Sequence, residues 1–153
     1  MNSLHIERTQ LEQLMPLIQE KLAAGHSVRF SPSGTSMLPL LVEGRDSVVL
    51  SPTPDKLKKY DLPLYKRDSG QYVLHRIVCV GQTYTCIGDN QFYNEYGIRH
   101  DQIIAVVTSF TRKGKLVHTH NFLYGIYCRI WHYSRPFRHF TVRSINWLRR
   151  HFR

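Results

Sequence analysis

Short runs of apolar and β-branched residues, separated by turn residues, are the feature of this chain that most limits its fold. The runs lie at residues 47–50, 64–67, 71–80, 83–87 and 103–107. Such runs are typical of strands. Turn residues such as Asp68-Ser69-Gly70 lie between them, so neighbouring strands are expected to reverse direction. The sequence therefore predicts a mainly β, α+β fold with an antiparallel, coiled or barrel-like sheet.

Before the first strand, residues 7–24 have apolar side chains at helical spacing, and Gly25 supplies a natural stop. The apolar positions are Leu11, Leu14, Met15, Ile18 and Leu22. A chain of 153 residues, 42% of them hydrophobic, is long enough to bury the core of one domain. We therefore expect an N-terminal amphipathic helix in residues 1–26, a β domain in residues 27–118 and an appendage in residues 121–153.

Ser36 is a candidate nucleophile because it follows a glycine turn and precedes an apolar run. Gly34 can adopt a backbone conformation that other residues avoid, which allows the serine hydroxyl to point out of a sheet edge. A serine hydroxyl is a weak nucleophile and needs a neighbouring base. His75 is the best candidate, because β-branched neighbours in the expected strand 71–80 would keep its imidazole neutral. The alternative is a histidine with a purely structural role in the core.

Three ordered blocks of sequence carry a resemblance to a known family. They are S-G-T-S-M-L-P-L-L with E-G-R-D-S-V-V-L, then Y-V-L-H-R-I-V, then I-G-D-N-Q-F-Y-N-E. In order and approximate spacing, over about residues 27–108, they resemble the signal peptidase I and SOS-repressor superfamily of serine proteases. Through the His-Arg pair of the second block, the chain resembles the endoplasmic-reticulum and archaeal signal peptidases, which use histidine, more than it resembles the bacterial branch, which uses lysine.

The resemblance implies a serine endopeptidase in which Ser36 is the nucleophile and His75 the general base. Two carboxylates are candidates for orienting the imidazole. Glu95 falls where histidine-type members carry a catalytic aspartate, whereas Asp89 belongs to the Gly-Asp-Asn motif. We expect Glu95 to orient the ring, and Asp89 and Asn90 to support the site through hydrogen bonds. The alternatives are a turn residue for Asp89 and an exposed loop carboxylate for Glu95.

The oxyanion of the reaction needs preformed donors, and the backbone N–H of Ser36 is the natural first one. In bacterial signal peptidases a serine two positions earlier, across a single glycine, supplies the second. Here the spacing is one residue longer, so Ser33 and Thr35 are both candidates. No cofactor is expected. No metal is expected either, because His118 and His120 have no nearby cysteine or clear carboxylate partner.

The formal net charge of +10 arises in the last third of the chain, since residues 102–153 hold ten Lys and Arg and no Asp or Glu. From residue 121 onward, apolar and aromatic residues recur every three or four positions, and Pro136 is expected to separate two helices. This pattern fits an interfacial helix on anionic lipid, and equally a helical hairpin docked on the domain or on a partner protein. Nucleic acid is a weaker candidate, because no reading motif accompanies the charge.

Neither a membrane-spanning run nor a signal peptide is visible in the sequence. We therefore expect a cytoplasmic protein, peripheral at the membrane if the basic segment binds lipid. The three cysteines, Cys79, Cys86 and Cys128, form no Cys-x-x-Cys pair and are expected to be reduced and buried.

Together these features predict a serine endopeptidase that removes a leader or signal segment from an extended peptide or preprotein. The expected lack of an anchor favours a small exported or modified peptide as the substrate over bulk secretion. Two alternatives remain. One is a non-catalytic relative that binds peptide, membrane or nucleic acid. The other is an autoproteolytic regulator of the SOS-repressor type, which the histidine base and the expected lack of a DNA-binding domain disfavour.

Overall fold

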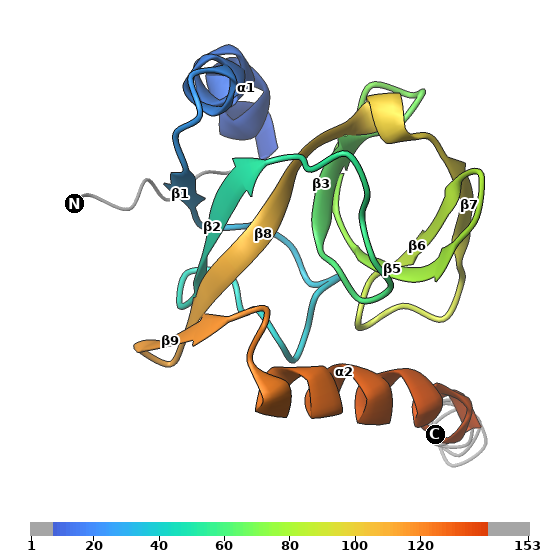
Figure 1. Cartoon of the computed structure of the whole chain (residues 1–153). Coiled ribbons are helices and arrows are strands. Elements are labelled where there is room, and N and C mark those ends of the chain that lie inside the picture. The colour runs from blue at the N-terminus through green and yellow to red at the C-terminus, as the bar shows by residue number, and fades with distance from the viewer. Residues whose placement is uncertain (1–7, 141–153) are drawn as a thin grey trace, which may run out of the picture.

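Antiparallel strands form most of the regular structure in residues 8–140, the part of the chain that the computed structural model describes (Figure 1). The mainly β, α+β prediction is therefore confirmed. In chain order the elements are α1 (Arg8–Ala23), β1 (Val28–Phe30), β2 (Ser47–Pro52), β3 (Pro63–Lys66), β4 (Tyr72–Leu74), β5 (Arg76–Val80), β6 (Tyr84–Ile87), β7 (Glu95–Ile98), a 3₁₀ turn (His100–Gln102), β8 (Ile103–Arg112), β9 (Lys115–His118) and α2 (Phe122–Tyr133).

The strands form two sheets. The larger has the order β1-β2-β8-β3-β4, with β9 added to β8, and the smaller has the order β5-β6-β7. Strand β8 is long enough for two partners in succession, since Ile103–Val106 pairs with β3 and Ser109–Arg112 pairs with β9. In Figure 1 the smaller sheet curves beside β3. The result is a pair of antiparallel sheets joined through the segment between β4 and β5.

The structure corrects the prediction of one continuous strand at residues 71–80. The chain leaves the larger sheet after Leu74 and enters the smaller one at Arg76, so His75 lies between two strands. Residues 73–78 are all buried, because elements cover both sides of the chain where it crosses between sheets. The strands β7 and β9 were not predicted, since glycine and charged residues obscure their pattern.

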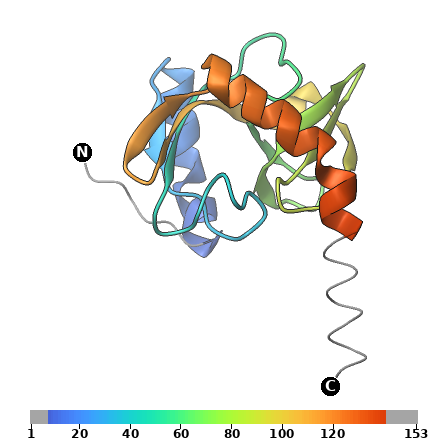
Figure 2. The same ribbon diagram turned by 90° about the horizontal axis from the view of Figure 1, so that it is seen from below.

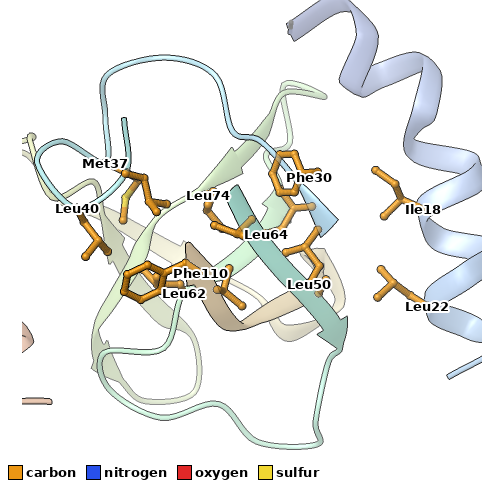
Figure 3. Packing of buried hydrophobic residues seen from close by; sticks show 14 of the residues in the cluster. Ile18, Leu22, Phe30, Met37, Leu40, Leu50, Leu62, Leu64, Leu74 and Phe110 are labelled. Atoms are coloured by element: carbon orange, nitrogen blue, oxygen red, sulfur yellow. The ribbon is translucent and has the colours of Figure 1, made fainter. Parts of the chain in front are cut away.

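Helix α1 confirms the predicted N-terminal helix and packs on the larger sheet through Met15, Ile18 and Leu22, each at most 6% exposed. Figure 3 shows Ile18 and Leu22 pointing from α1 toward Phe30 and Leu50. The helix ends in a Schellman motif. The His26 N–H donates to the Lys21 carbonyl at 3.0 Å, and Gly25 has a φ of 79°.

Helix α2 runs along one side of the molecule, across both sheets (Figures 1 and 2). Its Tyr124 and Cys128 are buried against the domain, so this helix packs on it. The helix ends at Tyr133 with Ser134 as its C-cap, and residues 135–140 are helical again, so the interruption lies two positions before Pro136, which was expected to separate two helices. The predicted continuation over residues 141–153 lies outside the described residues. None of the helices within residues 8–140 is long and apolar enough to cross a membrane.

Candidate active site

Ser36 lies in the loop between β1 and β2, which apolar side chains hold against the core. Met37, Leu40 and Leu41 are each at most 5% exposed, and Figure 3 shows Met37 and Leu40 beside the core residues of the sheet. Gly34 has a φ of 90°, in the left-handed region expected for this turn, and its N–H donates to the Glu43 carboxylate at 2.8 Å. The loop is therefore fixed on both sides of Ser36, whose side chain stays half-buried.

The Gly-Asp-Asn turn at residues 88–90 packs directly on the backbone of this loop. The Asn90 N–H donates to the Ser36 carbonyl at 2.9 Å, and the Asn90 side-chain amide donates to the Thr35 carbonyl at 3.2 Å. A Cβ on Gly88 would lie only 2.6 Å from the Ser36 carbonyl oxygen. Glycine is thus required at residue 88 for close approach, and Asn90 has the supporting position that was predicted for it.

Asp89 lies in the same turn, and its carboxylate binds a buried cation, Arg76. Its two carboxylate oxygens accept hydrogen bonds from the Arg76 guanidinium at 2.8 and 2.7 Å, and both side chains are at most 1% exposed. Arg76 also donates to Tyr124 Oη at 2.8 Å, and the Trp131 indole N–H donates to the Asp89 carbonyl. Asp89 therefore supports the turn and the docking of α2, and the structure does not place it at His75.

His75 is 2% exposed. Its imidazole contacts Glu95, the residue expected to orient it. Its Nδ1 lies 2.8 Å from Glu95 Oε1, although 20 positions separate the two residues in the sequence. Glu95 is the first residue of β7, which pairs with β6. The Tyr65 hydroxyl, on β3, lies 3.3 Å from the same nitrogen. Of the two candidate carboxylates, Glu95 is the one that contacts the imidazole.

The Glu95 carboxylate stays ionised because it has two hydrogen-bond donors. Burial alone raises the pKa of this carboxyl, but hydrogen bonds from His75 and Arg67 outweigh burial and lower the pKa to about 2. Arg67 donates through Nε to Glu95 Oε2 at 2.8 Å and through a terminal nitrogen to Oε1. An ionised carboxylate can only accept hydrogen bonds, so Nδ1 of His75 carries the proton and Nε2 is left as the basic nitrogen.

A cavity of about 120 Å³ brings the candidate residues together. Ser33, Ser36, His75 and Arg67 all line it, whereas Thr35 is exposed and does not. Much of the remaining wall is apolar and includes Leu11, Phe30, Met37, Leu64, Tyr72 and Leu74. Among the described contacts no hydrogen bond joins Ser36 to His75; such bonds are often long in unliganded sites and tighten when substrate binds. Of the two candidates for a second oxyanion donor, Ser33 is the one at the cavity.

Arg67 and Tyr65 are site residues that the sequence analysis missed. Both come from β3 and its end, and they meet Glu95 and His75 only through pairing of distant segments. The Tyr65 phenol is fully buried, and burial raises its pKa, so it remains a neutral hydrogen-bonding group. The residue pattern of the expected strand at 64–67 does not indicate that Tyr65 would contact His75 or that Arg67 would contact Glu95.

The cysteines and paired histidines lie apart from this site. Cys86 and Cys128 are buried free thiols as predicted, and burial raises the pKa of Cys86 to about 12; Cys79 is exposed, so its predicted burial is wrong. The His118 and His120 rings lie 5.2 Å apart. In residues 8–140 no group of three His, Cys, Asp or Glu side chains is placed to hold a metal ion.

Comparisons with protein-family models, with curated proteins and with solved structures each gave no match for this chain.

Proposed function

We propose that the protein is a serine endopeptidase of the signal peptidase I and SOS-repressor superfamily. The observation that carries the proposal is that His75, whose Nδ1 contacts Glu95, lines the same cavity as Ser36. A hydroxyl, an imidazole and an ionised carboxylate are the three groups of a serine catalytic triad. The three ordered sequence blocks provide independent support, because they place these residue types in the order found in that superfamily.

In the proposed mechanism, Nε2 of His75 accepts the Ser36 hydroxyl proton as the serine oxygen attacks a peptide carbonyl. Glu95 stabilises the imidazolium that forms. The Ser36 N–H and the Ser33 hydroxyl donate hydrogen bonds to the oxyanion. His75 then returns the proton to the leaving amine, and water hydrolyses the acyl-enzyme with the imidazole again acting as base. Arg67 is a positioning residue, since it holds Glu95 in its ionised form.

The substrate is proposed to bind as an extended strand along β4. This strand pairs only with β3 among the described strands, and its Tyr72, Val73 and Leu74 line the cavity immediately before His75. A peptide added to this edge would gain backbone hydrogen bonds while its side chains enter the apolar cavity. A volume of about 120 Å³ suits small side chains next to the cut. This supports removal of a leader or signal segment.

A fluorophosphonate probe, which reacts with activated serines, tests the assignment. We expect labelling of the wild type and loss of labelling in Ser36→Ala and His75→Ala. Ser69→Ala, which alters a serine in an exposed turn, is the matched control and should label like the wild type. Equal labelling of all four proteins would contradict the proposal. No labelling of any of them would favour the non-catalytic alternative.

The leader-peptidase role needs a separate measurement. Mass spectrometry of digests of a peptide library should show cuts after small residues in extended sequences. Spontaneous accumulation of two fragments of the chain itself would instead support the autoproteolytic alternative. Efficient cleavage of ordinary preproteins would contradict the preference for small peptides.

A further inference from the structure

The outward face of α2 exposes large apolar side chains. Within the described residues these include Phe122 (80% exposed), Leu123 (72%), Ile130 (64%), Tyr133 (67%) and Phe137 (78%), together with Ile126. They recur every three or four positions, which puts those of α2 on one face of the helix. Contiguous apolar patches of this kind are uncommon on soluble monomers and mark sites of interaction.

This face cannot turn inward, because the opposite face of α2 is already docked. Tyr124 and Cys128 are buried, and both contact the Arg76 guanidinium, at 2.8 and 2.9 Å. The Trp131 indole N–H donates to the Asp89 carbonyl at 2.9 Å. In Figure 2, which views the molecule from below, α2 is the foremost element and crosses both sheets. The apolar face is therefore held rigidly on the outside of the domain.

The segment that carries this face has cations as its only ionised side chains. Residues 102–140 contain Lys and Arg but no Asp or Glu. Arg129 and the hairpin residues Lys113 and Lys115 are exposed. A symmetric contact with a second copy would bring these cations together and is disfavoured for that reason. Anionic lipid complements both the charge and the apolar face.

A hollow lined by both apolar and basic residues, Phe92 and Pro136 among them, adjoins the end of the apolar face. His132, Tyr133, Arg135 and His139 line it. Arg135 Nε and His132 Nδ1 are buried without a hydrogen-bond partner among the described residues. The Arg135 guanidinium can only donate, so its unsatisfied Nε beside this hollow is suited to a phosphate oxygen, and an anionic headgroup would bring one when the adjacent apolar residues enter the acyl region.

We propose that the exposed face of α2, together with Arg135, docks the protein on the surface of an anionic membrane. The helix lies in the interface without crossing the bilayer. This inference does not depend on the peptidase assignment, since none of the residues that carry it lines the Ser36 cavity.

Vesicle flotation of the full chain tests the proposal. We expect binding to phosphatidylcholine vesicles containing phosphatidylglycerol to exceed binding to pure phosphatidylcholine at least about tenfold, and to weaken as salt rises from about 0.1 M to about 1 M. The triple variant Leu123→Ser, Ile130→Ser, Phe137→Ser should lose about tenfold or more of the binding, because it removes apolar area without changing charge. Arg135→Gln should bind several-fold more weakly.

The matched control is Leu17→Ser, Tyr93→Ser, Tyr96→Ser, which removes three exposed apolar side chains elsewhere and should bind within about twofold of the wild type. Circular dichroism establishes that each variant is folded. Failure of the wild type to bind, undiminished binding by the α2 variant, or equal binding to neutral vesicles would overturn the proposal. So would a wild-type dimer that the α2 variant dissociates, measured by light scattering.

Discussion

Gly88→Ala is the substitution that most directly tests the coupling between the Gly-Asp-Asn turn and Ser36. The added Cβ would lie 2.6 Å from the Ser36 carbonyl oxygen. Ordinary van der Waals contact begins at 3.4 Å, so the Ser36 loop or the turn has to move by about 0.8 Å. The φ of Gly88 is not in the left-handed region, so alanine adds a steric conflict without adding backbone strain.

A displacement of about 1 Å at reacting groups costs about 10²-fold in rate. The rate constant for fluorophosphonate labelling should therefore fall by about 30- to 100-fold in Gly88→Ala, and the free energy of unfolding should fall by about 1–3 kcal/mol. Gly81→Ala is the matched control, because its Cβ would meet nothing closer than the Thr83 carbonyl at 3.7 Å. If the two folded variants react at rates within about threefold of each other, the proposed dependence of Ser36 on the turn is refuted.

Three further results are expected. Glu95→Gln should slow labelling about 10²-fold or more, since the neutral amide cannot stabilise the imidazolium, whereas Glu20→Gln on the exposed side of α1 should not. The pKa of Glu95 is lowered from 4.5 to about 2 in the folded protein, so its carboxylate stabilises the fold above about pH 4.5 and that contribution is lost as pH falls toward about 2. The free energy of unfolding of the wild type, measured in urea, should then fall by about 2–3 kcal/mol as pH is lowered across this window, and Glu95→Gln should not show this decrease. Equal pH dependence in both proteins would argue against the low pKa. Asp89→Asn should lower the free energy of unfolding by about 3–5 kcal/mol because it leaves Arg76 buried without its counter-charge, while Asp68→Asn, at an exposed ion pair with Arg99, should change it by less than about 1 kcal/mol; similar effects of the two would contradict a structural role for the buried pair.

The elements with a clear local pattern were predicted correctly from the sequence. The apolar spacing of residues 7–24 and the stop at Gly25 correspond to α1 and its Schellman motif, and the β-branched runs correspond to β2, β3, β6 and part of β8. Strand β7 was missed because its four residues include Glu95 and Gly97, which are unfavourable in strand interiors. Its pairing with β6 depends on the rest of the sheet.

The candidate site was likewise predictable only in part from the sequence. Ser36 and His75 are candidates from residue types and order, and the carboxylate favoured by the resemblance, Glu95, is the one that lies at the imidazole. Contacts between distant segments could not be predicted. Arg76 is buried against Tyr124, which lies 48 residues later in the sequence. The link between Arg67 and Glu95 spans 28 residues and likewise has no local signature.

The central claim is that Ser36 is a nucleophile activated by His75, and mapping of the fluorophosphonate adduct tests it most directly. Wild-type protein treated with the probe is digested, and the modified peptide is located by mass spectrometry. The account predicts one phosphonylated residue, Ser36, with no adduct in either Ser36→Ala or His75→Ala. An adduct on another serine, or one on Ser36 that forms at the same rate without the imidazole, would contradict it.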